Sequence, residues 1–277
     1  MVLSYKPRLK RIIVIPSTLF IKDNEPIKTF KVGQLARWCS IFRVERIIIY
    51  QLDEEYRNGI FLKNILEYIE TPQYLRKYLF PKKKIFRNVG VLPPLRTLSH
   101  SKIHEFKKIK YRDGLVLNKV GRNKYLVYVG EEEPVVVVGK PGRKKRVVIK
   151  ITSSGMGRII DRHKVPYYWG YTVSMVENIF EALKLEHSVL KIGTSRLGDD
   201  IRKIYRKILR IIQNKRYNAI AFYFGSYDKG LLEIIGDRDP KNFFDIFVNL
   251  VPFQATKTVR TEEAVPIALS IFNVLIS

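Results

Sequence analysis

The sequence predicts an α/β protein whose parallel sheet is interrupted along the chain by a small all-β module. Three observations support this prediction. Apolar strand-like runs alternate with amphipathic helical segments at both ends of the chain. Two of the later strands are almost entirely apolar, as expected where helices cover both faces of a sheet. Between the two ends, short β-branched and aromatic runs recur about every ten residues, separated by glycine, asparagine and proline.

The first third of the chain contains a β-α-β alternation. Strands are predicted at residues 11–20 and 46–52, and the helix between them repeats apolar residues at Val32, Leu35, Cys39 and Phe42. A second helix begins near Glu54. We expect it to end at Thr71, because Pro72 disfavours helical geometry in the residue before it.

The middle of the chain has the sequence pattern of a small β-barrel. From about Ile109 to Ile151 the short β runs predict an antiparallel barrel or sandwich. Prolines at positions 81, 93 and 94 and the basic run Lys82 to Lys84 indicate the exit from the first domain. The predicted domains are a discontinuous α/β domain, residues 1–92 and 164–277, and an inserted barrel, residues 93–163.

After the barrel the β-α alternation returns. We predict helices near residues 173–185, 199–215 and 266–276, and strands at residues 188–193, 219–225 and 243–251. The helix at 199–215 has one apolar face, and its other face is basic, with Arg202, Lys203, Arg206, Lys207 and Arg210. Such a face is either simply solvated or in contact with phosphate.

The charge balance points to a polyanionic partner. The chain of 277 residues carries 51 Lys and Arg against 26 acidic residues, for a formal charge of +25. Nucleic acid is the leading partner and an anionic membrane the second; no apolar run approaches the ~18 residues needed to span a bilayer. A single cysteine, Cys39, excludes an intrachain disulfide and fits a reducing compartment. We read the basic, apolar N-terminus as a first strand and expect a cytoplasmic protein.

Three loops follow predicted strands and precede helices: the opening stretch, residues 192–200 and residues 223–231. In an open parallel sheet, ligands bind beyond the carboxyl ends of the strands, so these loops predict a cleft. Gly193 and Gly198 have the spacing of a phosphate-binding loop, but Asp199 and Asp200 would repel phosphate. No GxGxxG follows a strand. No metal site is predicted either, since His100 and His104 lack a recognisable third ligand.

Several segments resemble a known family. The segments IGTSRLG (192–198), FGSYDKGL (224–231) and VPFQATKTVRTEEAVPIALSIFNVLI (251–276) resemble the C-terminal half of the SPOUT superfamily of S-adenosylmethionine-dependent RNA methyltransferases. The segments LPPLRTLSH, YRDGLV and WGYTV are similar to an archaeal and eukaryotic branch with an OB-fold-like barrel inserted in the methyltransferase domain. This resemblance implies a trefoil-knotted parallel sheet, a homodimer, S-adenosylmethionine as cofactor and RNA, expected to be ribosomal, as substrate.

The resemblance also implies site residues. Three loops are expected to bind the cofactor through Thr194, Ser195, Gly225, Ser226, Gly230, Asn249, Pro252, Gln254, Thr258 and Val259. Small residues in a tight turn suit an adenosyl group, which needs backbone partners and a flat apolar slot. Arg260 stands where the best-known branch has asparagine. We hypothesise that Arg260 orients the target base or a phosphate, with Arg96 and His100 as further catalytic candidates; the alternative is that Arg260 pairs with Glu262 or Glu263. Thr261 is expected to cap the final helix, and Pro266 to kink it unless it starts later.

The barrel has the composition of an RNA-binding surface. Basic residues alternate with aromatic ones, as in proteins that track phosphates and stack bases. The predicted RNA contacts are Lys107, Lys108, Lys110, Arg112, Arg143, Lys144, Lys145 and Arg146. The rival interpretation is a non-catalytic, ribosome-associated RNA-binding protein that retains the fold. The three loops favour the enzyme, because a pure binder has no need for a glycine-lined cleft.

Overall fold

The chain forms two compact units. The computed structural model describes residues 4–101, 109–142, 145–151, 156–185, 187–213 and 216–276. A sheet unit comprises Pro7–Glu67, Lys84–Pro93 and Tyr171–Ser277, and a barrel unit comprises Met1–Lys6, Tyr68–Lys83 and Pro94–Gly170. The barrel unit is thus larger than the predicted insertion. One reason is that Tyr74, well before residue 93, donates its hydroxyl to the backbone carbonyl of Asp113 at 2.8 Å.

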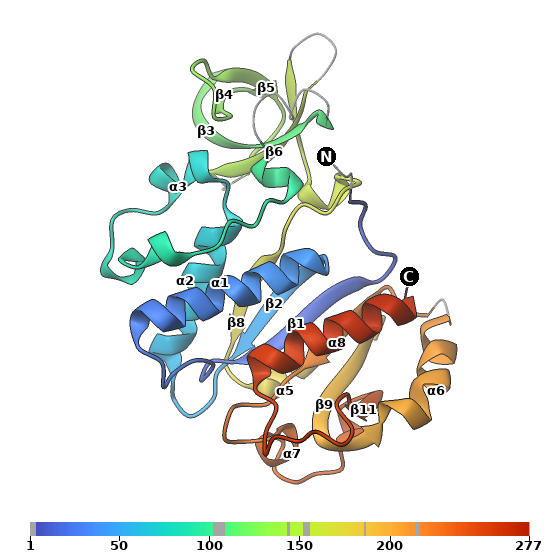
Figure 1. Ribbon diagram of the computed structural model, residues 1–277. Coiled ribbons are helices and arrows are strands. Elements are labelled where there is room, and N and C mark those ends of the chain that lie inside the picture. The colour runs from blue at the N-terminus through green and yellow to red at the C-terminus, as the bar shows by residue number, and fades with distance from the viewer. Residues whose placement is uncertain are drawn as a thin grey trace. The chain divides into compact units, whose positions relative to one another are not determined.

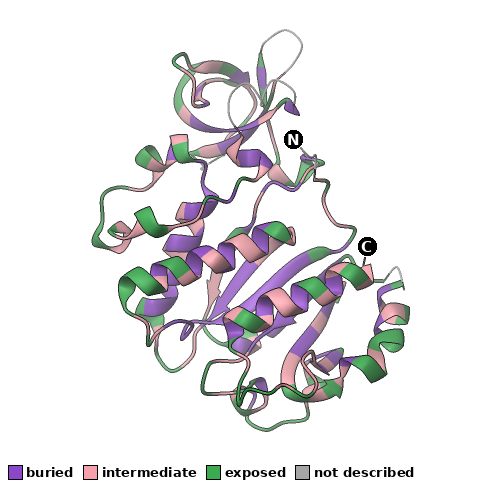
Figure 2. Cartoon of the chain, viewed as in Figure 1, coloured by how far each residue is buried: buried purple, intermediate pink, exposed green. Residues whose placement is uncertain are grey.

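The sheet unit is built on six parallel strands in the order β11-β9-β10-β1-β2-β8. Their bounds are β1 Lys10–Pro16, β2 Val44–Tyr50, β8 Thr172–Val176, β9 Val189–Asp200, β10 Ala219–Tyr223 and β11 Ile246–Asn249. The central strands β1 and β10 are buried along nearly their whole length, because helices cover both faces of the sheet (Figure 2). This confirms the predicted class, a parallel sheet flanked by helices.

Helices pack on both faces of this sheet. On one face α1 (Glu25–Ile41) and α8 (Thr261–Ile276) lie side by side (Figure 1). Here Phe272 of α8 meets Phe222 of β10 with ring centroids 4.9 Å apart. The other face packs against α5 (Ile179–Leu183) and α7 (Leu231–Ile234). The remaining helices are α2 (Tyr56–Glu70), α3 (Gln73–Leu79) and α6 (Ile201–Gln213). Among the described residues no helix is long and apolar enough to cross a membrane.

The prediction of a helix over residues 173–185 was wrong in its first half. Residues Thr172–Val176 form the edge strand β8, which pairs with β2, and only Ile179–Leu183 is helical. Val173, Val176 and Phe180 have helical spacing, but β-branched Thr172, Val173 and Val176 favour a strand when a neighbouring strand offers a ladder. Asn178 caps the short helix, since its side chain accepts the N–H of Glu181 at 3.0 Å.

The barrel unit contains a closed five-stranded barrel in the order β3-β4-β5-β7-β6 (Figure 1). Its strands are β3 Tyr111–Gly121, β4 Lys124–Tyr128, β5 Val135–Val138, β6 Arg146–Ile151 and β7 Gly157–Ile160. Most of the ladders are antiparallel, and β5 pairs with β7 in parallel. Alternate residues point inward, so Val127, Val137 and Ile149 meet in a small core. The predicted small barrel is confirmed.

A buried ionic cluster holds the barrel unit together. Arg146 of β6 donates to Glu70 at 2.7 Å and to Asp113 at 3.0 Å, and Arg162 also pairs with Glu70. Burial alone would raise the pKa of Glu70, but the two arginines outweigh it and lower that pKa. The carboxylate is therefore ionised and fully engaged by its partners.

Candidate functional site

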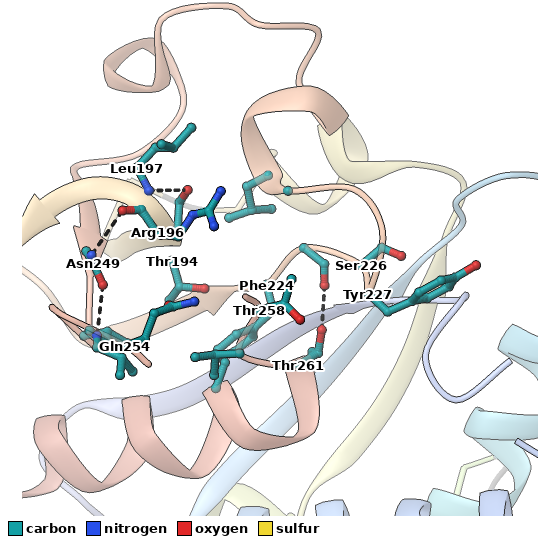
Figure 3. Close-up of a pocket in the computed structure, with 18 of the residues that line it drawn as sticks. Thr194, Arg196, Leu197, Phe224, Ser226, Tyr227, Asn249, Gln254, Thr258 and Thr261 are labelled. Atoms are coloured by element: carbon teal, nitrogen blue, oxygen red, sulfur yellow. Dashed lines mark hydrogen bonds between the residues drawn. The ribbon is translucent and has the colours of Figure 1, made fainter. Parts of the chain in front are cut away.

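A cavity of about 270 Å³ opens at the carboxyl edge of β9, β10 and β11 (Figure 3). Three loops and the first turns of α8 supply its walls, all within the sheet unit. Its polar lining consists largely of hydroxyl and amide side chains, including Thr194, Ser195, Ser226, Asn249, Gln254, Thr258 and Thr261. Its apolar lining includes Leu197, Leu250, Val251, Val259 and Ile267. A slot of this composition is typical of small-molecule sites.

The first loop is a bulge within β9. Strand β11 pairs Phe247 with Gly193 and then Val248 with Asp199, so residues 194–198 leave the ladder and form a wall of the cavity. Thr194 anchors this bulge by donating its hydroxyl to the Tyr223 carbonyl at 2.8 Å. Gly198 is required for packing, because a Cβ there would lie 2.5 Å from the backbone carbonyl carbon of Val248. The phosphate-loop spacing of the two glycines thus has a structural cause.

Hydrogen bonds join the first loop to the third, residues 250–260. Asn249 donates its amide to the carbonyl of Arg196 at 3.1 Å and accepts the N–H of Val251 at 3.0 Å (Figure 3). Arg196 in turn donates to the carbonyl of Lys257 at 3.1 Å. Gln254 donates to the carbonyl of Thr256 at 2.9 Å, which closes the third loop on itself. Two segments more than 50 residues apart therefore hold one another in place.

The second loop, residues 224–230, is fixed to the start of α8 and to the loop after β1. Thr261 donates its hydroxyl to the Gly225 carbonyl at 2.8 Å (Figure 3). Ser226 donates to Asp228 at 2.6 Å and accepts from the hydroxyl of Thr18 at 3.1 Å. Thr18 belongs to the opening stretch, so that predicted loop contacts the second loop through Ser226, although Thr18 itself does not line the cavity. At the rim, Lys22 lies 4.3 Å from the ring centroid of Tyr227.

The cavity is lined by acidic groups, Asp228 in its second loop and Glu233 in helix α7. Partial burial would raise the pKa of Asp228, but its hydrogen bond from Ser226 and other donors lower the pKa overall, so the carboxylate stays ionised. Glu233 accepts the N–H of Gly230 at 3.2 Å. Arg196 and Lys257 also line the cavity, so it offers a ligand charges of both signs.

The structure gathers every predicted cofactor residue except Pro252 around this one cavity. It also adds residues that were not predicted to bind the cofactor: Arg196, Leu197, Phe224, Tyr227, Asp228, Leu231, Glu233, Leu250, Val251, Lys257, Thr261, Ala264 and Ile267. Most of these are neighbours of predicted residues within the same loops. Ala264 and Ile267 lie on α8 and follow a helical spacing from Thr261, which was the available signal.

The three catalytic candidates lie in different places. Arg260 is exposed and lies between two lining residues, Val259 and Thr261. Arg96 is exposed and His100 is half-buried, both in the barrel unit rather than among the residues that line the cavity. The imidazole of His100 lies 2.8 Å from the Glu70 carbonyl, and burial lowers its pKa. The imidazole is thus engaged with the backbone, and His100 is not among the residues that line the cavity.

The helix cap also differs from the prediction. Helix α8 begins at Thr261, whose hydroxyl contacts Gly225 rather than the helix N-terminus. Glu263 accepts the backbone N–H of Arg260 at 2.8 Å, and Glu262 lies 3.7 Å from Lys31. The two acids proposed as partners of the Arg260 guanidinium thus bind a backbone N–H and a lysine. Pro266 lies within the helix, which continues through it.

The predicted RNA contacts of the barrel divide into three groups. Lys107, Lys108, Arg143 and Lys144 lie outside the described residues. Lys110 and Lys145 are exposed. Arg112 is only 3% exposed and donates to the carbonyls of Val129 and Ser101 at 2.7 and 2.9 Å, while Arg146 belongs to the buried ionic cluster. Arg112 and Arg146 therefore have structural roles in the barrel unit, which corrects their assignment to an RNA-facing surface.

A parallel α/β sheet with a cavity beyond the carboxyl ends of its strands defines an α/β protein with a candidate small-molecule site at that edge of its sheet. The particular family follows from sequence comparison. The chain belongs to a family described as "putative RNA methyltransferase", whose model matches residues 10–272. This confirms the predicted enzyme class, a SPOUT-type RNA methyltransferase, and its cofactor, S-adenosylmethionine.

Several known proteins are similar to the chain over most of its length. A human protein named 28S rRNA (uridine-N(3))-methyltransferase is 28% identical over 93% of this chain and 76% of its own. An uncharacterized protein of Halobacterium salinarum is also 28% identical, over 93% of this chain and 96% of its own. A solved structure of a probable methyltransferase from Bordetella pertussis aligns over 97% of both chains with 10% identity and a TM-score of 0.41.

Proposed function

We propose that this protein transfers the methyl group of S-adenosylmethionine to N3 of a uridine in large-subunit ribosomal RNA. The observation that carries the proposal is the cavity itself, which three loops form at the carboxyl edge of β9, β10 and β11. The choice of uridine N3 and of ribosomal RNA rests on the name of the human relative. The net charge of +25 suits an RNA substrate.

The lining suits S-adenosylmethionine. Its adenosine would take the apolar slot and the backbone and amide groups of the first and third loops, where Thr194, Asn249 and Gln254 lie. The ionised carboxylate of Asp228 would favour the positive charge that the cofactor bears. Gly230 leaves room, since a Cβ at that position would meet no atom within 4 Å. When bound, S-adenosylmethionine supplies a methyl group already activated by a positively charged sulfur.

The chain must then position the uracil and allow the proton on its N3 to leave. N3 of uracil carries a hydrogen between two carbonyls, so loss of this proton to water places negative charge on N3 and on the two carbonyl oxygens. A positively charged donor near those oxygens stabilises this charge. We infer that Arg260, exposed beside the cavity lining, supplies that donor or holds an adjacent phosphate.

Substitution of Arg260 tests this role. Arg260→Ala is expected to lower kcat by about 10²–10³-fold, the usual cost of one transition-state donor, and to leave the affinity for S-adenosylmethionine unchanged. Arg260→Lys keeps the charge and should recover part of the rate. Unchanged turnover in folded Arg260→Ala would exclude the catalytic role.

We also propose that the protein acts as a homodimer. Exposed apolar side chains lie along the neighbouring helices α1 and α8: Ile27, Phe30, Ile41 and Val274 are 49, 44, 50 and 76% exposed. The three α1 residues follow one helical stripe, and such exposed stripes commonly pack against another protein. Sedimentation velocity of Phe30→Glu against wild type tests this. A dimeric wild type and a monomeric Phe30→Glu variant would support the interface, and equal masses for the two proteins would reject it.

The activity is tested by incubating the protein with labelled S-adenosylmethionine and a large-subunit ribosomal RNA transcript. The proposal predicts label in the RNA and a heat of binding when the cofactor is titrated alone. RNA binding without label and without that heat would favour the rival function, a non-catalytic RNA-binding protein.

A further inference from the structure

Phe253 has two properties that fold stability does not explain. Its side chain is 85% exposed, so it gains almost nothing from burial. Its backbone has a φ of 60°, in the left-handed region that a bulky residue rarely adopts. Strained, exposed residues of this kind concentrate at functional sites. Phe253 also lies in the third loop, between the cavity-lining residues Val251 and Gln254.

A stacked arginine holds the exposed ring. The guanidinium carbon of Arg202 lies 4.5 Å from the ring centroid of Phe253. Asp200 fixes this guanidinium through bonds of 3.0 Å from Nε and 2.5 Å from Nη2. The hydrogen bonds from Arg202 lower the pKa of Asp200 to about 2, so the pair remains ionised at neutral pH. The exposed ring of Phe253 thus packs against the guanidinium of Arg202, which Asp200 in turn holds in place.

The same arginine begins a basic surface on α6. Five exposed cations lie on this helix, which contains no acidic residue: Arg202, Lys203, Arg206, Lys207 and Arg210. The opposite face is buried in the sheet unit through Ile201, Ile208 and Ile212. Tyr205 adds a second aromatic ring, 38% exposed and bonded through its hydroxyl to Arg206 at 3.0 Å. Cations interleaved with exposed rings are the composition that binds single-stranded nucleic acid.

We propose that Phe253 and the basic face of α6 together form a docking surface for a single-stranded segment of the RNA substrate. One base stacks on Phe253, and the adjoining phosphates contact the cations of α6. Because Phe253 belongs to the loop that lines the cavity, this contact places neighbouring nucleotides at the mouth of the site. The inference rests on the proposed function in that the substrate is RNA.

Charge decides between RNA and a second copy of the chain as the occupant. A symmetric dimer through this surface would bring the five cations of α6 towards the five of its partner. Such a contact repels, whereas a phosphate backbone is attracted by the same charges. RNA is therefore the occupant that the surface favours.

The test measures binding of a labelled single-stranded oligouridylate by fluorescence anisotropy, without cofactor. Phe253→Gly is the decisive variant, because glycine accepts a φ of 60° and relieves the strain while removing the ring. It is expected to unfold at the same or a higher temperature and yet bind RNA about 5- to 100-fold more weakly. Phe253→Trp should restore binding. Tyr56→Ala, which removes an exposed ring from α2, is the matched control and should bind as wild type.

A second pair of variants tests the basic face. Replacing Arg206, Lys207 and Arg210 with Glu should weaken RNA binding and reduce the dependence of the RNA affinity on salt concentration. Reversing Arg57, Lys184 and Lys241 makes the same change in net charge at exposed positions on other elements and should have a much smaller effect. Equal effects of the two triple variants would overturn the proposal.

The outcomes also separate this inference from the proposed function. If Phe253→Gly binds RNA as well as wild type, the docking surface is rejected even if methyl transfer is observed. If Phe253→Gly instead lowers the dimer mass in sedimentation with RNA affinity unchanged, the residue is a subunit contact and the proposal fails. If wild type binds RNA through this surface but transfers no methyl group, the docking surface stands and the proposed function falls.

Discussion

The hydroxyl of Thr261 donates to the backbone carbonyl of Gly225 at 2.8 Å, so the first residue of α8 is fixed to the second loop of the cavity. Thr261 is 5% exposed, and its bond spans 36 residues of sequence. The last helix and the cavity thereby form one structural unit, and a change at the start of α8 should reach the cofactor site.

Replacing Thr261 with Val tests this connection. The substitution keeps the shape and removes the donor of a part-buried hydrogen bond, at a cost of about 0.5–1.5 kcal/mol in unfolding free energy. Because the second loop loses its anchor, affinity for S-adenosylmethionine should also fall about tenfold. Urea unfolding and calorimetric titration measure the two effects. Thr261→Ser retains the bond and should be near wild type; a Val variant with normal cofactor affinity would contradict the connection.

The two glycines of the second loop should respond differently to substitution. A Cβ on Gly230 meets no atom within 4 Å, and its φ of −67° and ψ of 164° suit any residue. Gly230→Val is thus expected to leave the melting temperature unchanged and to block cofactor binding by filling the cavity.

Gly225 is the matched contrast. A Cβ there would lie 2.8 Å from the Lys229 carbonyl oxygen, so Gly225→Ala should distort the loop and lower both stability and binding. Thermal melting with and without S-adenosylmethionine distinguishes the two cases. Cofactor stabilisation that persists in Gly230→Val would mean that the cofactor binds elsewhere.

The buried carboxylate of Glu70 should matter far more than its neighbour on the same helix. Glu70→Gln removes the carboxylate partner of Arg162 and one of the two carboxylate partners of Arg146, and we expect a loss of about 3–5 kcal/mol in unfolding free energy. Glu67 lies 4.0 Å from Lys63 and is 40% exposed, so Glu67→Gln should cost less than about 1 kcal/mol. Similar costs in guanidinium unfolding would show that the cluster contributes little.

His100 should make stability depend on pH. Burial lowers its pKa below the usual 6.5, while the Glu70 carbonyl opposes that shift and Arg76 and Arg146 add to it. The folded chain therefore keeps the ring neutral, and below pH ~6.5 the unfolded chain binds the proton first. The contribution of neutral His100 to the unfolding free energy is fully present above that pH. It falls as the pH decreases, by at most about 1.4 kcal/mol per pH unit for this one group.

The matching variant is His100→Gln, studied by urea unfolding between pH 7.5 and 5.5. The pKa of Glu70 is lowered from 4.5, so loss of its stabilisation belongs to more acidic conditions. The unfolding free energy of the variant should decline less steeply with acidification than that of wild type. Parallel curves for the two proteins would assign the decline to other groups.

The strands and the loops of the site could be predicted from sequence because their signals are local. Apolar runs such as residues 219–223 and the loop motifs around Gly225 and Asn249 are visible in a few residues each. The bulge at 194–198 could not be predicted, since it depends on the register of β9 against β11, about 50 residues later. Edge strand β8 was missed for the same reason.

Burial of charge was also invisible in the sequence. Arg112 and Arg146 occur in basic runs that look solvent-exposed, yet Arg146 finds Glu70 from 76 residues away. The neighbouring sequence does not distinguish an arginine that pairs with a buried carboxylate from one that binds RNA. Conversely, Phe253 looks like an ordinary core aromatic, and only its φ of 60° and its 85% exposure identify it as a surface residue.

The identity of the methylated nucleoside tests the central claim most directly. After incubation with S-adenosylmethionine and a large-subunit ribosomal RNA transcript, complete digestion and mass spectrometry should find 3-methyluridine at one position, and Gly230→Val should yield none. A methyl group on another base, or 3-methyluridine formed equally well by Gly230→Val, would contradict the proposed reaction or the proposed site.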